Sequence, residues 1–343
     1  MSARGGSKTT RVERYVHHSG EELEIPVGTV VGARSGPKFG VSSGMHAGEF
    51  AGMRAAIRLW QELDPATLRG EVRIIPIMST RAFFARSTQL SPVDERELHF
   101  QPAGRPEGTY SEFQIDCVFN LLRDLDFHVD MHAGEYVQAL DPWVAFADPT
   151  TNERLRRDTW RLAGSMPVPY LDPRQAEIQD EFSKLDQGLP FALLGVGVAN
   201  VWTEIGQNGV QDPADIELQY QSLANALKRF DMIDGEPVPV PPQAILGPRR
   251  WSMESLESGY WQSEVSIGQK VSKGQRVGVL EDLAGNQIKT YTAPEDAVVQ
   301  YFWTSPAINA ERVPHGYPWH RGLIRLSELR PDAHRDPRLE LAR

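Results

Sequence analysis

The chain has little cysteine, no long apolar run and fewer positive than negative charges. With Cys117 as its single cysteine among 343 residues, it can form neither an internal disulfide framework nor a thiolate-cluster metal site. No run approaches the roughly 20 apolar residues of a membrane helix, and residues 1–14 lack the apolar core of a signal peptide. The 36 Lys and Arg against 46 Asp and Glu leave a net charge of −10, which argues against nucleic acid or an anionic membrane as the main partner. We therefore expect a cytoplasmic protein.

The rest of the composition is that of an ordinary globular protein, with 40% hydrophobic and 24% charged residues. At about 150 residues per domain, the length predicts roughly two domains with a large core. Nine histidines are present, and a few of them fall in informative places.

Apolar runs typical of strands alternate with helical patterns over the first 230 or so residues. This alternation predicts an α/β fold with a mixed, mostly parallel sheet flanked by helices. We expect strands at residues 28–31, 38–41, 72–77, 127–131 and 196–203, and helices at residues 48–63, 111–125, 152–164 and 213–230.

The composition of the sequence changes near residue 235. Residues 235–248 hold five prolines and predict a stiff extended linker or edge strand. Beyond them, glycine turns separate short β-like runs, which indicates a small all-β domain. We therefore predict a catalytic α/β domain over residues 1–236, a β domain of barrel-sandwich type over 237–330 and a charged tail over 331–343.

The strongest local motif is GMHAGE at residues 44–49, between an expected strand and an expected helix. Three positions apart on a first helical turn, His46 and Glu49 point the same way and could both reach one cation. Catalytic zinc takes three protein ligands and leaves one position open. The alternative is a helix-start glutamate beside a partly exposed histidine.

A second motif, DFHVDMH, occupies residues 126–132. It ends at the carboxyl edge of a strand, where open α/β sheets build their sites. Because His128, Asp130 and His132 alternate along the strand, they share one face. In the functional interpretation His132 is a third ligand, Asp130 orients a ligating imidazole and His128 is structural. The alternative is a buried hydrogen-bonded network without a metal.

A third motif places Glu204 at the end of the apolar run 196–203, just before Gly206. A lone buried carboxylate is costly without a partner. It could be a general base beside an activated water, or one member of a structural ion pair.

Together the three motifs resemble the succinylglutamate desuccinylase/aspartoacylase family, a branch of the zinc carboxypeptidase fold. The resemblance spans roughly residues 25–325, and many members carry a small β domain at the end of the chain. It implies one Zn²⁺ per chain, held by His46, Glu49 and His132, with Glu204 as general base and then acid.

The chain departs from the family at the substrate-binding stretch Asp-Leu-Asn-Arg. The corresponding Asn-Arg pair is His99-Phe100 here, and the upstream family arginine falls near Gln89, although Arg86 could substitute for it. A carboxylate clamp needs a guanidinium, which phenylalanine lacks. We expect a substrate other than acetylaspartate or succinylglutamate, with His99 as hydrogen-bond donor or proton shuttle and Phe100 as a wall. The alternative is a displaced loop in which Arg81, Arg86, Arg96 or Arg105 binds the carboxylate.

The expected function is zinc-dependent hydrolysis of the linear amide bond of a small N-acyl amino acid or a related amide. A zinc peptidase acting on short peptides and a catalytically silent small-molecule-binding homologue are the alternatives. The sequence predicts a small-molecule amide as partner, excludes nucleic acid and membrane, and leaves homo-oligomer formation open.

Overall fold

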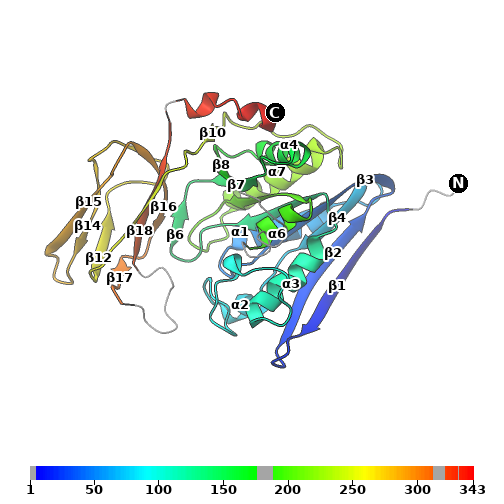
Figure 1. The fold of residues 1–343 in the computed structure, drawn as a ribbon, viewed down its shortest axis with the longest axis horizontal. Coiled ribbons are helices and arrows are strands. Elements are labelled where there is room, and N and C mark those ends of the chain that lie inside the picture. Colours follow the sequence, from blue (N-terminus) through cyan, green and yellow to red (C-terminus); the bar gives the residue numbers. More distant parts are fainter. Residues whose placement is uncertain (1–4, 176–187, 312–320, 331) are drawn as a thin grey trace.

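A nine-stranded mixed sheet forms the centre of the chain. The computed structural model describes residues 5–175, 188–311, 321–330 and 332–343 (Figure 1). The strand order is β1-β2-β4-β3-β5-β9-β7-β8-β10. The strands are β1 (Ser7–Val16), β2 (Glu22–Val31), β3 (Arg34–Ser43), β4 (Arg69–Ile75), β5 (Phe127–His132), β7 (Trp143–Asp148), β8 (Tyr170–Gln175), β9 (Ala199–Glu204) and β10 (Ala244–Ile245).

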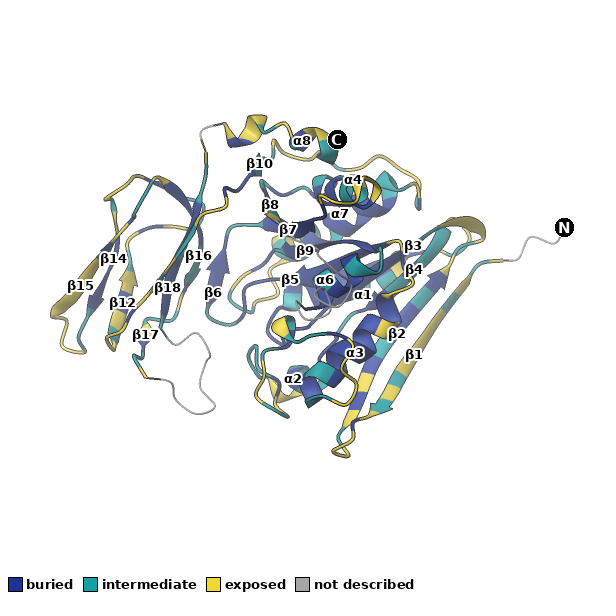
Figure 2. Cartoon of the chain, in the orientation of Figure 1, coloured by how far each residue is buried: buried dark blue, intermediate teal, exposed yellow. Residues whose placement is uncertain are grey.

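The pairing is mixed, as the sequence predicts. β3 pairs in parallel with β4 and β5, β5 with β9, and β8 with β7 and β10. The pairs β1/β2, β2/β4 and β7/β9 are antiparallel. Figure 2 shows the central strands buried, whereas β1 at the edge is largely exposed. β1 is polar because only one neighbour covers it, and for that reason the apolar pattern did not reveal it.

Helices cover both faces of the sheet. The core on one face includes side chains of α1 (Phe50–Glu62), α4 (Glu153–Gly164), α7 (Pro213–Arg229) and α8 (Leu339–Ala342). The core on the other face includes side chains of α3 (Tyr110–Leu122) and α6 (Leu189–Gly195), and the short helix α2 (Thr80–Ala85) packs against β2. The helices expected around residues 50, 111, 152 and 213 are confirmed.

The end of the chain forms two further antiparallel sheets around a separate apolar core. One contains β11 (Arg250–Glu254), β18 (Gly322–Glu328), β16 (Ala297–Trp303) and β13 (Lys270–Val271), and β6 (Gln138–Leu140) pairs with β16. The other contains β15 (Gln287–Thr292), β14 (Arg276–Glu281), β12 (Gly259–Ser263) and β17 (Ala307–Ile308).

Several contacts join the two parts of the chain. β6 leaves the α/β part to pair with β16, and β10 adds to the edge of the large sheet although it lies beyond residue 236. In the expected charged tail, Leu339 and Ala342 join the core beside α4, after a short 3₁₀ turn at Ala333–Arg335. The division into domains at residues 236 and 330 stays a prediction.

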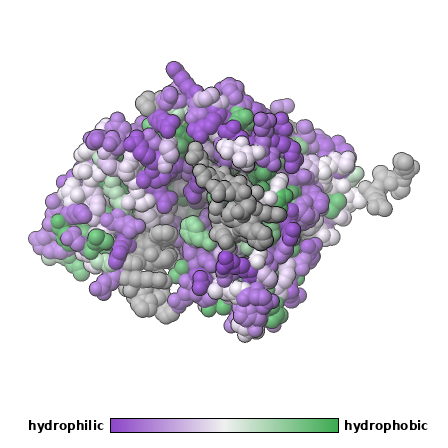
Figure 3. All heavy atoms as spheres, in the orientation of Figure 1, coloured by the Kyte–Doolittle hydropathy of each residue, from purple (hydrophilic) through white to green (hydrophobic). Residues whose placement is uncertain are grey.

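Within the described residues, no helix combines the length and apolar character needed to cross a bilayer. The face of the molecule in Figure 3 is mostly hydrophilic.

Candidate active site

The loop between β3 and α1 carries the first two members of a buried cluster. Gly44 adopts a φ of 67°, and a Cβ there would lie 3.1 Å from the Ile77 backbone, so the tight turn favours glycine. The turn brings His46 and Glu49 together, with Nδ1 of His46 2.7 Å from Oε1 of Glu49. Both side chains are buried.

The end of β5 adds the third member. Nδ1 of His132 lies 3.1 Å from Oε2 of Glu49. This contact lacks hydrogen-bond geometry, so Oε2 has no hydrogen-bond partner among the described residues. One ligand atom from each of His46, Glu49 and His132 lies within 4.8 Å of the others. Two imidazole nitrogens and an unsatisfied carboxylate oxygen suit a divalent cation such as zinc.

Each histidine of the cluster turns its other ring nitrogen to a carboxylate outside it. Nε2 of His132 lies 3.2 Å from Oδ2 of Asp130, as the sequence interpretation expects. Nε2 of His46 lies 2.7 Å from Oε1 of Glu97, a residue that the interpretation missed. Metal-ligating histidines are typically oriented in this way. Glu97 lies two residues before His99, in the stretch that lacks the family's Asn-Arg pair. The sequence signal for it is a carboxylate within a loop of the site.

Asp130 is itself fixed by a buried network. Ser42 donates a hydrogen bond to Oδ1 of Asp130 at 2.6 Å, and its hydroxyl also lies 2.9 Å from Nε2 of His128. Burial lowers the pKa of His128 to about 4. His128 therefore contacts the network that holds Asp130, through the Ser42 hydroxyl.

The electrostatics of the cluster favour a cation at its centre. Burial opposes ionisation of Glu49, but the charges of His46 and His132 outweigh it and lower its pKa to about 2. Burial likewise opposes protonation of both histidines, yet the surrounding carboxylates raise their pKa values well above the usual range. Without a metal, protons on the imidazoles balance the carboxylates, and a bound cation would replace them.

Glu204 ends β9 beside the cluster. It lies in register with His132 on β5 and with Trp143 on β7. Burial raises its pKa to about 7, against the opposing charges of His132 and His46. A carboxyl that gains and loses its proton near neutral pH is suited to general acid–base work.

The expected substrate-binding residues lie at different depths in the structure, with His99 close to the cluster and Phe100 exposed. The ring centroid of His99 lies 5.3 Å from that of His132 and 6.2 Å from that of His46. Burial lowers the pKa of His99 to about 4, so the ring is neutral at pH 7, and its buried Nδ1 has no hydrogen-bond partner among the described residues. Phe100 packs edge-on against His99 and is 63% exposed, so it stands at the rim of the site.

The candidate carboxylate-binding arginines make few contacts with the cluster. Arg81 pairs with Glu21, and Arg105 pairs with Glu112. Arg86 is exposed at the end of α2, where its charge acts on Tyr136. Gln89 lines a small pocket beside Ser79 and Leu98.

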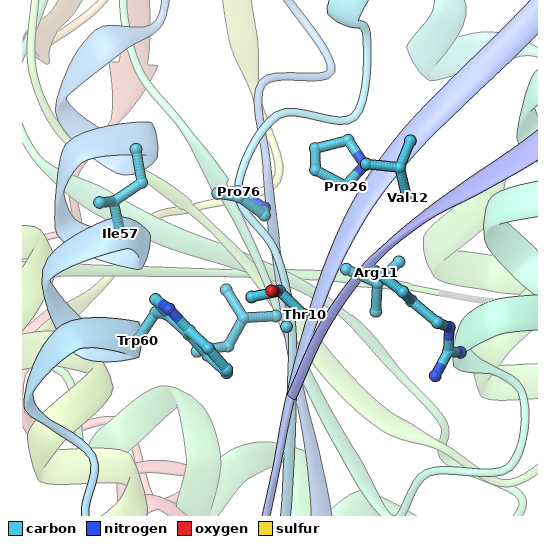
Figure 4. Close-up of a pocket in the computed structure, with 10 residues that line it drawn as sticks. Thr10, Arg11, Val12, Pro26, Ile57, Trp60 and Pro76 are labelled. Carbon is cyan, nitrogen blue, oxygen red and sulfur yellow. The ribbon is translucent and has the colours of Figure 1, made fainter. Parts of the chain in front are cut away.

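A separate hollow of about 390 Å³ lies between the β1–β2 hairpin and α1 (Figure 4). Ile57, Trp60, Pro26, Val12 and Pro76 line it. It lies on the α1 side of the sheet, and among its described lining residues only Thr10 and Arg11 carry polar side chains, so the cluster with its histidines and carboxylates is the candidate active site.

The fold is that of succinylglutamate desuccinylase/aspartoacylase family proteins, which confirms the resemblance drawn from the sequence. A solved succinylglutamate desuccinylase from a Silicibacter species has a TM-score of 0.79 and 20% identity, covering 94% of this chain and 95% of that one. The product-bound ectoine utilization protein EutE (DoeB) from Ruegeria pomeroyi has a TM-score of 0.80 and 19% identity, covering 94% and 95%.

A curated relative is the N-alpha-acetyl-L-2,4-diaminobutyric acid deacetylase of Halomonas elongata. It is 26% identical over 283 residues, which are 80% of this chain and 80% of the relative. No family model matches the sequence.

Proposed function

We propose that the chain is a metal-dependent amidohydrolase that removes the acyl group from a small N-acyl amino acid. The observation that carries this proposal is the convergence of His46, Glu49 and His132 beside a carboxyl, Glu204, whose pKa is about 7. The names of the relatives, a deacetylase and a desuccinylase, support it.

His46, Glu49 and His132 would hold one Zn²⁺ through two imidazole nitrogens and a carboxylate. When bound, zinc supplies a Lewis acid for the substrate carbonyl and lowers the pKa of water toward about 7. Asp130 and Glu97 fix the two imidazoles, so the ligand atoms need little rearrangement.

Glu204 carries out the proton transfers. In its ionised form it accepts a proton from the attacking water, and it then passes that proton to the leaving nitrogen. The neutral ring of His99, close to His132, can donate a hydrogen bond to the developing oxyanion or to a substrate oxygen.

The substrate that fits best lacks a second carboxylate. His99 and Phe100 occupy the positions at which the family's Asn-Arg pair is expected, and Arg81 and Arg105 are engaged elsewhere. The side chain of the substrate that the Halomonas relative is named for ends in an amine, in agreement with this choice.

A hydrolysis screen of the zinc-loaded chain tests the proposal. We expect turnover of N-acetyl-2,4-diaminobutyrate and similar N-acyl amino acids to exceed that of N-acetylaspartate and of dipeptides. A preference for N-acetylaspartate would contradict the substrate class. Preferred cleavage of dipeptides would instead indicate a peptidase, and no turnover of any amide would indicate a silent binding protein.

A further inference from the structure

A second polar region, here called the arginine cleft, lies between the large sheet and the sheet β11-β18-β16. Its volume is about 770 Å³, within the range of small-molecule sites. Strands β7 and β8 form one side and the antiparallel strands the other (Figure 1). Its charged lining residues are Arg174, Arg250, Arg325, Arg330, Arg338 and Asp172.

Among the described residues that line the arginine cleft, positive charges outnumber negative charges. Asp172 pairs with Arg250 and lies 3.6 Å from Nε of Arg174, so one carboxylate serves two guanidiniums. Arg325 has no carboxylate partner among the described residues. Its Nε donates to the Ser252 hydroxyl at 3.3 Å.

The charges of two further lining arginines are met by nearby carboxylates. Arg338 pairs with Asp336 at 2.8 Å. Arg330 lies 3.9 Å from Glu328, which Arg249 approaches more closely at 2.9 Å. The cationic excess therefore centres on Arg174, Arg250 and Arg325. Burial lowers the pKa of Arg250, and the like charges of Arg174 and Arg325 lower it further.

Two buried donors in the lining also lack acceptors. Trp143 is 3% exposed and Gln300 is 2% exposed. Within the described parts of the chain, neither Nε1 of Trp143 nor Nε2 of Gln300 has a hydrogen-bond partner. Because Oε1 of Gln300 already accepts from the Ser327 hydroxyl, its amide nitrogen is left to donate. Unsatisfied buried donors are costly, so an acceptor in the cleft would relieve both.

The arginine cleft adjoins the candidate active site without sharing its ligands. Trp143 lies in register with Glu204, and the guanidinium of Arg174 lies 4.9 Å from the ring centre of Trp202. The Trp202 ring in turn lies 6.1 Å from that of His99. An occupant of the cleft would thus sit one layer of side chains away from the cluster.

We propose that the arginine cleft binds a small anion through its carboxylate or phosphate oxygens, at a site separate from the His46–Glu49–His132 cluster. Guanidinium forks bind both kinds of oxyanion in a bidentate manner. The indole of Trp143 and the amide of Gln300 supply further donors that a planar or tetrahedral oxyanion can accept from. This binding does not depend on the proposed hydrolysis.

Calorimetry with the full-length, zinc-loaded chain at low ionic strength tests the proposal. Inorganic phosphate and succinate are titrated separately, with 1,4-diaminobutane as a cationic probe. We expect saturable binding of at least one anion and none of the diamine. Tighter binding of phosphate would identify the ligand as a phosphate, and tighter binding of succinate would identify it as a carboxylate.

Variants locate the binding. Arg325→Gln, and separately Arg174→Gln on the other wall, should weaken the anion by about tenfold to a hundredfold. The matched control Arg276→Gln removes an arginine of β14 that does not line the cleft, and it should bind as the wild type does. Thermal unfolding verifies that each variant is folded.

The proposal is overturned if neither anion binds saturably. It is equally overturned if the folded Arg325→Gln and Arg174→Gln variants keep the wild-type affinity, since the anion then binds elsewhere, for example at the metal.

Discussion

The His46–Glu49–His132 cluster and the arginine cleft lie on the same face of the large sheet. They differ in how their charges are balanced. Asp130, Trp202, Ala145 and Asp172 stand in register across β5, β9, β7 and β8. At strand spacings near 4.8 Å, about 14 Å separates Asp130 from Asp172. In the cluster, every charged group is buried against an opposite charge. Among the described residues that line the cleft, guanidiniums outnumber carboxylates.

This difference in charge balance indicates which kind of ion each region is suited to bind. Removing one member of the cluster leaves an unpaired buried charge, which is strongly destabilising, so the cluster is rigid and ready for a cation. Side chains of the cleft, such as Arg174, are partly solvated, and their loss costs less stability. Under our two proposals, the same sheet face therefore holds a closed site for a cation beside an open site for an anion.

Removal of the metal should have the largest effect, because it should abolish the activity of the cluster and leave anion binding in the arginine cleft intact. Dialysis against a chelator should reduce hydrolysis to background, because the imidazoles of His46 and His132 then hold protons in place of the cation. Phosphate or succinate binding in the cleft should survive. Amide turnover and calorimetry on the same chelated sample measure both, and zinc should restore the turnover. Full turnover by chain free of transition metal would remove the basis for treating the cluster as a metal site.

Glu204→Gln should have the next largest effect. The substitution keeps the size of the side chain and removes the proton acceptor, so kcat should fall by about 10²- to 10⁴-fold while zinc content stays unchanged. Steady-state kinetics and metal analysis are the measurements. Unchanged kcat would assign Glu204 a purely structural role.

Glu97→Gln should weaken zinc binding by about tenfold to a hundredfold, because the ligating His46 loses the carboxylate that orients its ring. Competition with a chromogenic chelator measures the affinity. Glu107→Gln, at an exposed position of the same connection between α2 and α3, is the matched control. Equal zinc affinity in the two variants would show that the contact between Glu97 and His46 does not support the metal.

The sequence predicts those parts of the site that depend on short-range patterns. His128, Asp130 and His132 alternate along one strand, so spacing alone places them on one face. His46 and Glu49 are three residues apart, but they precede α1, which begins at Phe50, so the loop after β3 and not a helical face brings them together. Glu97 lies 51 residues from His46, and only the fold of the connecting loop brings them together. No local periodicity carries that information.

The arginine cleft could not be predicted for the same reason. Arg174, Arg250 and Arg325 come from β8, β11 and β18, which belong to two different sheets. Each arginine alone resembles an ordinary surface residue. Strand β1 was not predicted for a different reason. It lies at a sheet edge, and its mostly polar sequence contains no continuous apolar run.

The smallest predicted effect concerns Glu135, a carboxyl near the cluster that is fully buried. Burial raises its pKa from 4.5 to about 8, and its Oε2 has no hydrogen-bond partner among the described residues. Between these two pKa values the unfolded chain has lost the proton and the folded chain keeps it. The contribution of Glu135 to the free energy of unfolding should therefore fall as pH rises from 4.5 to about 8 and then level off.

Glu135→Gln mimics the protonated side chain and should remove this part of the pH dependence. After a chelator has removed any metal, no metal cation lowers the pKa of Glu135. As pH rises from acidic to mildly alkaline values, the free energy of unfolding of the variant should then increase relative to that of the wild type by on the order of 1–3 kcal/mol. Denaturant unfolding at several pH values measures the difference, with Glu107→Gln expected to follow the wild-type curve. Parallel curves for Glu135→Gln and the wild type would mean that Glu135 is ionised in the folded chain. The surroundings of the cluster would then carry one more negative charge. A bound cation would stabilise them more than it would if Glu135 were protonated.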